Sequence, residues 1–545
     1  MKMKIKYLLV IIAIVVVAGG CKKFLNVKPL DDLSGNNFWE TQSDVERFTN
    51  DVYRIFKDEF AMKSAVLFMG DVRCAPVVVG AAYPPRGDVT FLSRNDLKNA
   101  IAADASRTSP TYDAIREWWQ RNTRWDLLDD WSPLFKVVQA ANILYEEAPK
   151  VQQKDPGLSD KMVKQYQGEA TFMRCLAYFY LIRLYSDVPY YINAYNEKSL
   201  PRTNHVEVAK KCIEDLEQHR KDVPWAYPDP TYRAIRAMQS SMLVLEMHFN
   251  MWLAGFDKTN ATNYYRKVDE LGDILYNEGE LAVGALKLYP MSQIFTVFQG
   301  RSQEGLFEVP QNINYGLFPQ NRRMTYAGTV IWESNLTNNS EANSVEDNVE
   351  MNYMSSFLRT LYPDEQQDDR IKAWFTFNNV NTMYAGNSQM LKFYNIALGP
   401  KGGDNALSNN YFIFRYPDAI LLQAEALASI GASLGNAEGG TAGPYNEKAA
   451  QLLNRIRSRA NTALFPANPG EGSLLDAIFY ERCKELMGEG HYYYDMVRTG
   501  RIYNPQYNYT NSMSYGQFLQ GAWTWPINKK AQTNNPLIQL NNYWN

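Results

Sequence analysis

The chain has 545 residues, of which 46% are hydrophobic, so it is long enough to bury an extensive core. Its formal net charge is −3 and it shows no basic stripe, which excludes a partner that is held through nucleic-acid phosphates. The four histidines form no HxxxH or HExxH pair, so we expect neither a histidine-based metal site nor any other cofactor.

The first 20 residues have the pattern of an export signal. Lys2, Lys4 and Lys6 precede an apolar segment, Tyr7 to Val17, and the small residues Ala-Gly-Gly then lead to Cys21. The apolar run is shorter than the roughly 20 residues that cross a bilayer, which disfavours a retained membrane span. Because a cysteine directly after Ala-Gly-Gly resembles a bacterial lipobox, Cys21 is predicted to be lipidated and to begin the mature chain; a plain secretory signal is the alternative.

Amphipathic helices are predicted along much of the remaining chain. The segment 166–185 places Tyr166, Ala170, Met173 and Ala177 on one stripe at intervals of three and four residues. Helices lined by alanine and joined by short loops indicate antiparallel pairs similar to tetratricopeptide hairpins, although the 34-residue consensus does not recur at a fixed period. Similar stripes lie around Asn142, in 205–222, 232–255, 260–277, 449–460 and 475–486, and Trp131 is predicted to be a core residue that opens such a helix.

Two regions, about 70–130 and 285–410, lack this helical period and are rich in turn-forming residues. Long irregular stretches are usually functional surface or disordered loop. The chain holds 36 Tyr and 12 Trp, and disordered segments are poor in aromatic residues, so an ordered functional surface is predicted. The end of the C-terminal tail, 502–545, is rich in Asn and Pro, and its aromatic residues are predicted to tie it to the body.

The cysteines after Cys21 show no metal or redox pattern. Cys74, Cys175, Cys212 and Cys483 are widely spaced and form no CxxC pair. Free buried thiols are predicted, and a disulfide between Cys175 and Cys212 is the alternative.

Six blocks of sequence, taken in order, resemble one protein family. They are CKKFLNVKP after the signal, GEATFMRCLAYFYLIRLYSDVPYY at 168–191, FRYPDAILLQAEALA at 414–428, LLNRIRSRA at 452–460, ERCKELMGEGHYYYDMVRTGR at 481–501, and the closing PINKKAQTNNPLIQLNNYW. Together they resemble the SusD/RagB family of outer-membrane nutrient-binding lipoproteins, over essentially the whole chain.

The resemblance implies a mostly α fold in which tetratricopeptide-like helical hairpins form an α-α superhelix beside an irregular, loop-rich lobe with little β structure. It implies a single body at 21–545, anchored by its lipid to the outer membrane at the cell surface and working with a SusC-like TonB-dependent transporter. Most members bind glycans, and some serve peptide uptake. The hairpin scaffold is expected at about 40–60, 131–280 and 411–490, and the ligand-binding lobe at about 70–130 and 285–410.

The predicted ligand site follows from the chemistry of sugars. A sugar ring offers an apolar face and a rim of hydroxyls, so a site needs aromatic plates with carboxylate, amide or guanidinium groups at their edges. Such contacts stay wet and shallow, and a free energy of binding of about −4 to −8 kcal/mol is expected. The predicted ligand-binding residues are Asp71, Arg73, Tyr83, Arg86 and Trp125 in the first irregular region, and Tyr315, Arg323, Tyr326, Trp332 and Tyr384 in the second.

The motif residues themselves are assigned to packing, and no catalytic residue is predicted. His491 and Asp495 lie four residues apart, but no nucleophile motif accompanies them, so core and capping roles are expected. The leading hypothesis is non-catalytic capture of oligosaccharides. An extracellular glycoside hydrolase, which needs two carboxylates across a sugar cleft, and a peptide-binding or scaffold lipoprotein are the alternatives. Partly buried ion pairs that fix helix packing are predicted for Arg415, Glu425, Glu481, Arg482 and Glu485.

Overall fold

The computed structural model describes most of the chain from residue 38 onward. Helices dominate the described residues and the strands are short, which confirms a mostly α fold with little β structure. None of the described helices is both long and apolar enough to cross a bilayer. The described residues are 38–61, 70–79, 87–105, 128–310, 351–363, 367–375, 392, 396–397, 406–407, 410–435, 442–466, 471–511 and 513–544.

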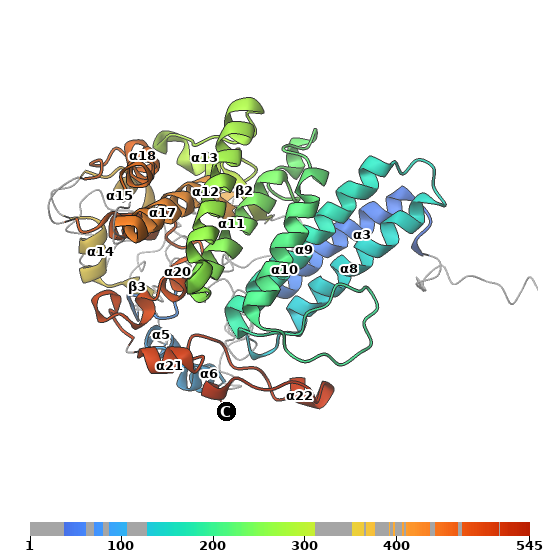
Figure 1. The fold of residues 1–545 in the computed structure, drawn as a ribbon, viewed down its shortest axis with the longest axis horizontal. Helices are drawn as coiled ribbons and strands as arrows, with labels where there is room; N and C mark the ends of the chain where they lie inside the picture. Colours follow the sequence, from blue (N-terminus) through green and yellow to red (C-terminus); the bar gives the residue numbers. More distant parts are fainter. Residues whose placement is uncertain are drawn as a thin grey trace, which may run out of the picture.

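One half of the molecule is a group of long helices that lie side by side (Figure 1): α3 (Gln42–Ile55), α8 (Ser132–Gln152), α9 (Asp160–Tyr185) and α10 (His205–His219). Side-chain caps fix where two of them begin, because the Ser159 hydroxyl accepts from Met162 N and the Asn204 side chain accepts from Val206 N. α9 is the central helix of this group. The sequence predicts one apolar stripe on it, but from Gly168 onward it is buried on every side, since neighbours cover all its faces.

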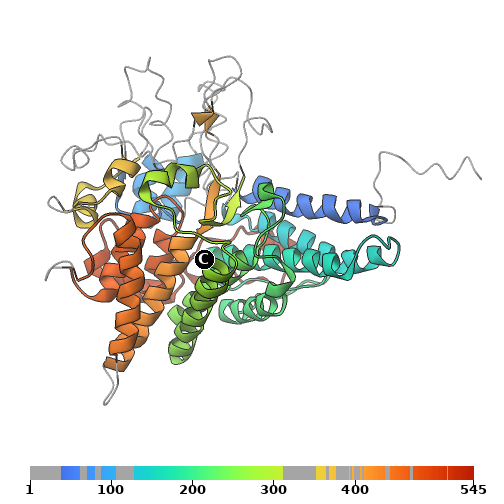
Figure 2. The same ribbon diagram turned by 90° about the horizontal axis from the view of Figure 1, so that it is seen from above.

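The second half continues the array. α11 (Gln239–Phe256) packs on α10, α12 (Ala261–Ile274) packs on α11, and α17 (Tyr416–Gly435) packs on α12. Successive helices therefore pair as hairpins, as predicted. Figure 2 shows the first group and the orange helices α17 and α18 running in clearly different directions. The remaining helices of this half are α18 (Gly443–Arg459), α19 (Leu474–Glu485) and α20 (Tyr492–Arg498).

The start of α11 differs from the prediction. The stripe predicts a helix from residue 232, whereas α11 begins at Gln239. The preceding segment is held across the first helix group, because Arg236 Nε donates to Glu169 at 2.7 Å and Arg236 Nη1 donates to Glu46 at 2.7 Å. Ala234 adopts a φ of 59°, which interrupts a helix.

Short elements surround the two halves. The strands form antiparallel pairs: β1 (Val77–Val79) with β3 (Met351–Tyr353), β2 (Gly305–Val309) with β6 (Tyr411–Arg415), and β4 (Ile396–Ala397) with β5 (Ala406–Leu407). The shorter helices include α5 (Gly87–Ser93), α6 (Leu97–Ala105), α13 (Ile294–Phe298), α14 (Ser355–Leu361), α15 (Arg370–Trp374), α21 (Tyr515–Leu519) and α22 (Lys530–Asn534), with the π-helical turns η1 (Phe56–Ala61) and η7 (Leu275–Ala282).

The core confirms several sequence predictions. Trp131 is buried at the N-cap of α8. Aromatic residues tie the C-terminal tail to the body, because the buried Trp523 ring packs against Trp252 with centroids 5.6 Å apart. The four cysteines that the structure describes are buried and free. The Cys175 thiol donates to the carbonyl of Cys212 at 3.6 Å, so the alternative disulfide is not formed.

Candidate functional site

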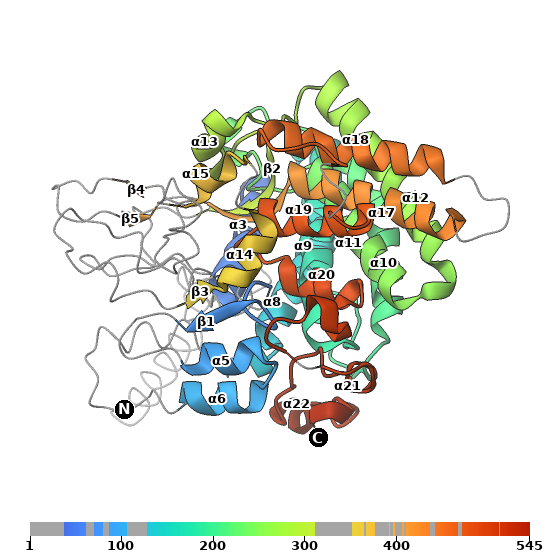
Figure 3. The ribbon, with the colours of Figure 1, turned by 90° about the vertical axis from the view of Figure 1, so that its left-hand side faces the viewer.

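Two short ladders join the ends of the chain segments that carry the predicted ligand residues. In the β1–β3 pair, Val79 lies opposite Met351, so the residue that precedes segment 80–86 is beside the residue that follows segment 311–350. In the β2–β6 pair, Val309 lies opposite Tyr411. Figure 3 shows β1, β3, β4 and β5 on the same side of the molecule. The two irregular regions are far apart in sequence, but the β1–β3 ladder therefore places the ends of their segments side by side.

The segment that leads into β1 is fixed to α20 by a close backbone contact. Gly70 O accepts from Tyr493 N at 2.7 Å, and Asp71 Oδ2 accepts from Gly490 N at 2.8 Å. A Cβ on Gly70 would lie 2.0 Å from Gly490 O, so only glycine allows the two chains to approach this closely. Burial raises the pKa of the Asp71 carboxyl to about 8, although the Gly490 N–H partly opposes it.

Arg73 anchors the same segment to the C-terminal tail. Its Nη2 donates to the carbonyls of Ala522 at 2.7 Å and Thr524 at 3.1 Å, while Nε donates to Asn95 Oδ1 at 2.8 Å. The guanidinium also lies over the Tyr493 ring, 4.7 Å from its centroid.

Asp71 and Arg73 are the two predicted ligand residues that the structure describes. Their exposed fractions are 4% and 1%, so their placement favours anchoring of the β1 segment over direct contact with a ligand. The other predicted ligand residues, Tyr83, Arg86, Trp125, Tyr315, Arg323, Tyr326, Trp332 and Tyr384, lie outside the described residues, as does the predicted lipidation site Cys21.

A buried group of charges, here called the base cluster, lies where the β2–β6 ladder meets the helices; it comprises Glu304, Lys392, Arg415, Glu485 and Glu489. Glu304 immediately precedes β2 and Arg415 ends β6. Arg415 Nη1 donates to Glu304 at 2.7 Å, while its Nη2 donates to Glu489 at 2.6 Å and to Glu485 at 3.1 Å. Lys392 Nζ donates to Glu489 at 2.6 Å. The cluster thereby joins the base of the irregular lobe to α19 and the turn that follows it.

The electrostatics of the base cluster favour the charged forms of Glu485 and Glu489. Burial by itself raises the pKa of the Glu489 carboxyl, but Arg415 and Lys392 outweigh it, so the pKa lies below its usual range. Burial lowers the pKa of Lys392 to about 8 despite the attraction of Glu489. Every carboxylate of the cluster has a cationic partner, which suits a structural role and leaves no free acid for catalysis within it.

The ion pairs predicted from the motif residues are confirmed, and they are buried more completely than predicted. The partners outside the predicted set, among them Arg370 and Glu304, were not predicted, because they are far away in sequence and lie in no recognisable spacing. The pairs are Arg415 with Glu485 at 3.1 Å, Glu481 with Arg370 at 2.6 Å, Arg482 with Asp495 at 2.8 Å and Glu425 with Arg498 at 2.5 Å.

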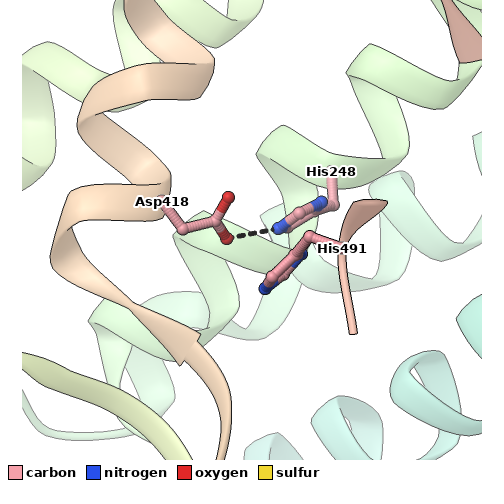
Figure 4. Close-up of side chains that lie close together, drawn as sticks. All are labelled: His248, Asp418 and His491. Carbon is pink, nitrogen blue, oxygen red and sulfur yellow. Dashed lines mark hydrogen bonds and ion pairs between the residues drawn. The ribbon is translucent and has the colours of Figure 1, made fainter. Parts of the chain in front are cut away.

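A second buried group brings together His248 of α11, Asp418 of α17 and His491, the N-cap residue of α20 (Figure 4). His248 Nε2 lies 2.6 Å from Asp418 Oδ2, and the two imidazoles stack with centroids 5.5 Å apart. Burial lowers the pKa of His491 to about 4 and also lowers the pKa of His248. Both rings are therefore neutral at pH 7. His491 has the core role that the sequence predicts, and it occupies the N-cap position of α20 without a side-chain cap hydrogen bond.

These three side chains could in principle hold a metal ion, since their ligand atoms lie within 4.8 Å of one another. The surroundings do not suit a cation. Arg482 Nη1 lies 2.8 Å from Asp418 Oδ1, so both carboxylate oxygens are already engaged and a positive charge is already in contact with the group. The arrangement fits an ion-paired packing contact between α11, α17 and α20.

Comparison with known proteins identifies the family. Residues 326–544 match the model of the SusD family, and residues 76–242 match a model described as "Starch-binding associating with outer membrane". A SusD homolog from Bacteroides thetaiotaomicron, solved by crystallography, is 34% identical with a TM-score of 0.76 over 93% of this chain and 100% of that chain.

More distant relatives agree over a similar length. SusD-like protein P38 of Formosa agariphila is 22% identical, and the alignment covers 96% of both chains. A solved laminarin-binding SusD-like protein is 17% identical, with a TM-score of 0.61 over 92% of this chain and 99% of that chain. The helical hairpins and the similarity to the Bacteroides thetaiotaomicron SusD homolog over almost the whole chain together show that this chain belongs to the SusD family.

Proposed function

We propose that this protein is a glycan-binding lipoprotein of the cell surface, which captures oligosaccharides and delivers them to a SusC-like TonB-dependent transporter in the outer membrane. The observation that carries the proposal is the match of residues 76–242 to a starch-binding family model whose description also names the outer membrane. The laminarin-binding relative supports the same ligand class. Neither matching family model is described as an enzyme, which favours binding without cleavage over the hydrolase alternative.

The geometry supports a single ligand lobe built from both irregular regions. The β1–β3 and β2–β6 ladders root the segments that carry Tyr83, Arg86, Tyr326 and Trp332 at neighbouring residues. Aromatic plates and polar edges on rooted segments are what a weak, wet sugar site requires. We assign ligand contact to the aromatic and arginine residues of these segments, and anchoring to Asp71 and Arg73.

The ligand class is tested by titrating the mature protein with a panel of glycans and of peptides, while assaying for released sugar. Trp332→Ala or Tyr326→Ala is expected to weaken glycan binding by about tenfold or more at an unchanged melting temperature. Tyr276→Ala serves as a control, because Tyr276 is a 40% exposed aromatic residue on η7. Released sugar would favour the hydrolase, and binding of peptides alone would favour the scaffold reading.

The membrane anchor is tested separately. Lipidation of Cys21 places several acyl chains on the first residue of the mature protein, which is sufficient for stable attachment. Cys21→Ser is expected to move the protein from the membrane fraction to the soluble fraction. Continued sedimentation with membranes would show that another anchor exists.

A further inference from the structure

A surface cleft lies between the start of α8, the connection that follows α9, and the C-terminal tail around α22. Its volume is about 620 Å³, within the roughly 300–1,000 Å³ of small-molecule sites. In Figure 1, α22 lies below α8, whereas β3 is on the opposite side of the view. The cleft is therefore separate from the β1–β3 ladder, and it lies beside the end of the first irregular region, because Asp129 and Asp130 line it.

One wall of the cleft is aromatic. The half-buried rings of Phe135 and Tyr191, which both line the cleft, stack 12° from parallel with centroids 6.0 Å apart, so each holds the other in place. Trp131, which also lines the cleft, packs edge-on against Phe135 at 87° and 5.6 Å and fixes that ring. Burial raises the pKa of Tyr191 to about 12, so its hydroxyl is neutral at physiological pH. A rigid ring surface with a neutral hydroxyl suits the apolar face of a sugar.

The opposite wall and rim are polar and already partly ordered. Asp129 Oδ2 accepts from Asn528 Nδ2 at 2.9 Å, and Asn535 Nδ2 donates to Leu200 O at 2.8 Å. These bonds hold carboxylate and amide groups in place along the cleft. Asn534, the last residue of α22, is exposed at the rim.

The charges in the cleft balance. Asp129 and Asp130 come from the start of α8, and Lys198 and Lys530 face them from the connection and the tail. A balanced set of charges offers little net attraction to an anion or a cation, whereas amides and carboxylates bind hydroxyl groups well. The cleft therefore fits a neutral, polyhydroxylated ligand.

We infer that this cleft is a second glycan-binding site, for a short neutral stretch of oligosaccharide, away from the β1–β3 ladder. The ligand class rests on the proposed function; the location rests on the cleft itself. Two weak sites on one chain would hold a long glycan more tightly than either site alone, because the second contact is intramolecular.

The test counts sites by calorimetry on the full mature protein, with a panel of neutral oligosaccharides that includes maltoheptaose and laminarihexaose. The wild type is expected to bind two per chain, and the double variant Trp332→Ala, Tyr326→Ala is expected to keep one site. Adding Tyr191→Ala should weaken that remaining site by about tenfold or more, whereas Tyr191→Phe should keep it within about threefold.

Two further variants separate loss of the site from loss of the fold. Asn534→Trp changes only an exposed rim residue and is expected to obstruct the cleft and weaken the same site. Tyr195→Ala is the matched control, because Tyr195 lies on the same connection with 60% exposure and does not line the cleft; it should leave affinity unchanged.

The possible failures are distinguishable. A single site that is removed by the lobe variants and is insensitive to Tyr191→Ala and Asn534→Trp would overturn this inference and leave the proposed function intact. If the cleft variants bind glycans normally but bind the transporter more weakly, the inference would also be overturned. The cleft would then be a protein interface. If the wild type binds no glycan, both this inference and the proposed function would be overturned. If only the cleft variants reduce glycan binding, the cleft site would be supported and the assignment of the ligand site to the lobe would be overturned.

Discussion

Replacement of Arg415 by methionine tests whether the base cluster stabilises the fold. The Arg415 side chain is fully buried, and its guanidinium donates to Glu304 at 2.7 Å, Glu489 at 2.6 Å and Glu485 at 3.1 Å. Methionine fills much of the same volume but carries no charge, so the carboxylates lose a shared partner without a large cavity.

The expected cost follows from the partners that remain. Glu304 and Glu485 keep Arg459, and Glu489 keeps Lys392, so the variant is left with roughly one uncompensated buried charge. Removal of one partner from a buried ion pair typically costs about 3–5 kcal/mol. Because whole domains are stable by only about 5–15 kcal/mol, this loss is a large share of the total.

The assay is urea unfolding followed by circular dichroism, with Arg54→Met as the matched control. Arg54 forms a comparable pair with Asp51 at 3.0 Å, but the two side chains are 61% and 46% exposed. Exposed pairs contribute about 0–1 kcal/mol. We expect Arg415→Met to lower the urea midpoint by roughly 1 M or more and Arg54→Met to leave it nearly unchanged. Equal midpoints for the two variants would refute the role given to the base cluster.

Four further expectations concern titration, anchoring and metal. The pKa of Asp71 is raised to about 8 in the folded protein, so its contribution to stability is present below about pH 4 and is lost as the pH rises through 8. Asp71→Asn should therefore raise the melting temperature more at pH 9 than at pH 5. Equal shifts of the melting temperature at the two pH values would contradict this. The same variant should change glycan affinity by less than about twofold, whereas a direct charged contact would cost about 1.5–3 kcal/mol. Glu489 and Asp495 have lowered pKa values, so the stability that they contribute is present above about pH 4 and is lost as the pH falls further, which thermal unfolding between pH 2 and 5 can measure. Dialysis against EDTA should leave the melting temperature unchanged, because Asp418 is already ion-paired with Arg482 and bound to His248; a clear decrease would show that the group holds a metal.

The helices were predictable because their signals are local. The apolar stripes in 205–222 and 475–486 correspond to α10 with the turn that follows it and to α19, within one residue at each end. The helix start predicted at residue 232 was wrong, because Arg236 forms ion pairs with Glu169 and Glu46. The periodicity of one segment does not reveal such distant partners. Local sequence thus fixes where apolar faces lie, and distant charges decide where a helix begins.

The candidate site was less predictable, since its geometry depends on long-range pairs. Asp71 and Arg73 looked like ligand residues because they precede an aromatic, turn-rich stretch. Their partners, Gly490 and the carbonyls of Ala522 and Thr524, are more than 400 positions away. Nothing in the local composition distinguishes an arginine that binds a sugar hydroxyl from one that binds a distant carbonyl.

Stability and ligand binding meet at the same residues in this fold. Arg415 ends β6 and Glu304 immediately precedes β2, so the ion pair between them fixes the ladder from which the second irregular region extends. Lys392, within that region, is held by Glu489 and by the carbonyls of Glu485 and Met487, each at 2.6–2.8 Å. A weak ligand cannot supply the entropy cost of ordering its own site, because ordering one backbone residue costs about 1–2 kcal/mol. The buried charges hold the roots of the lobe in place beforehand, so under the proposed function a few aromatic contacts would be enough to bind a sugar.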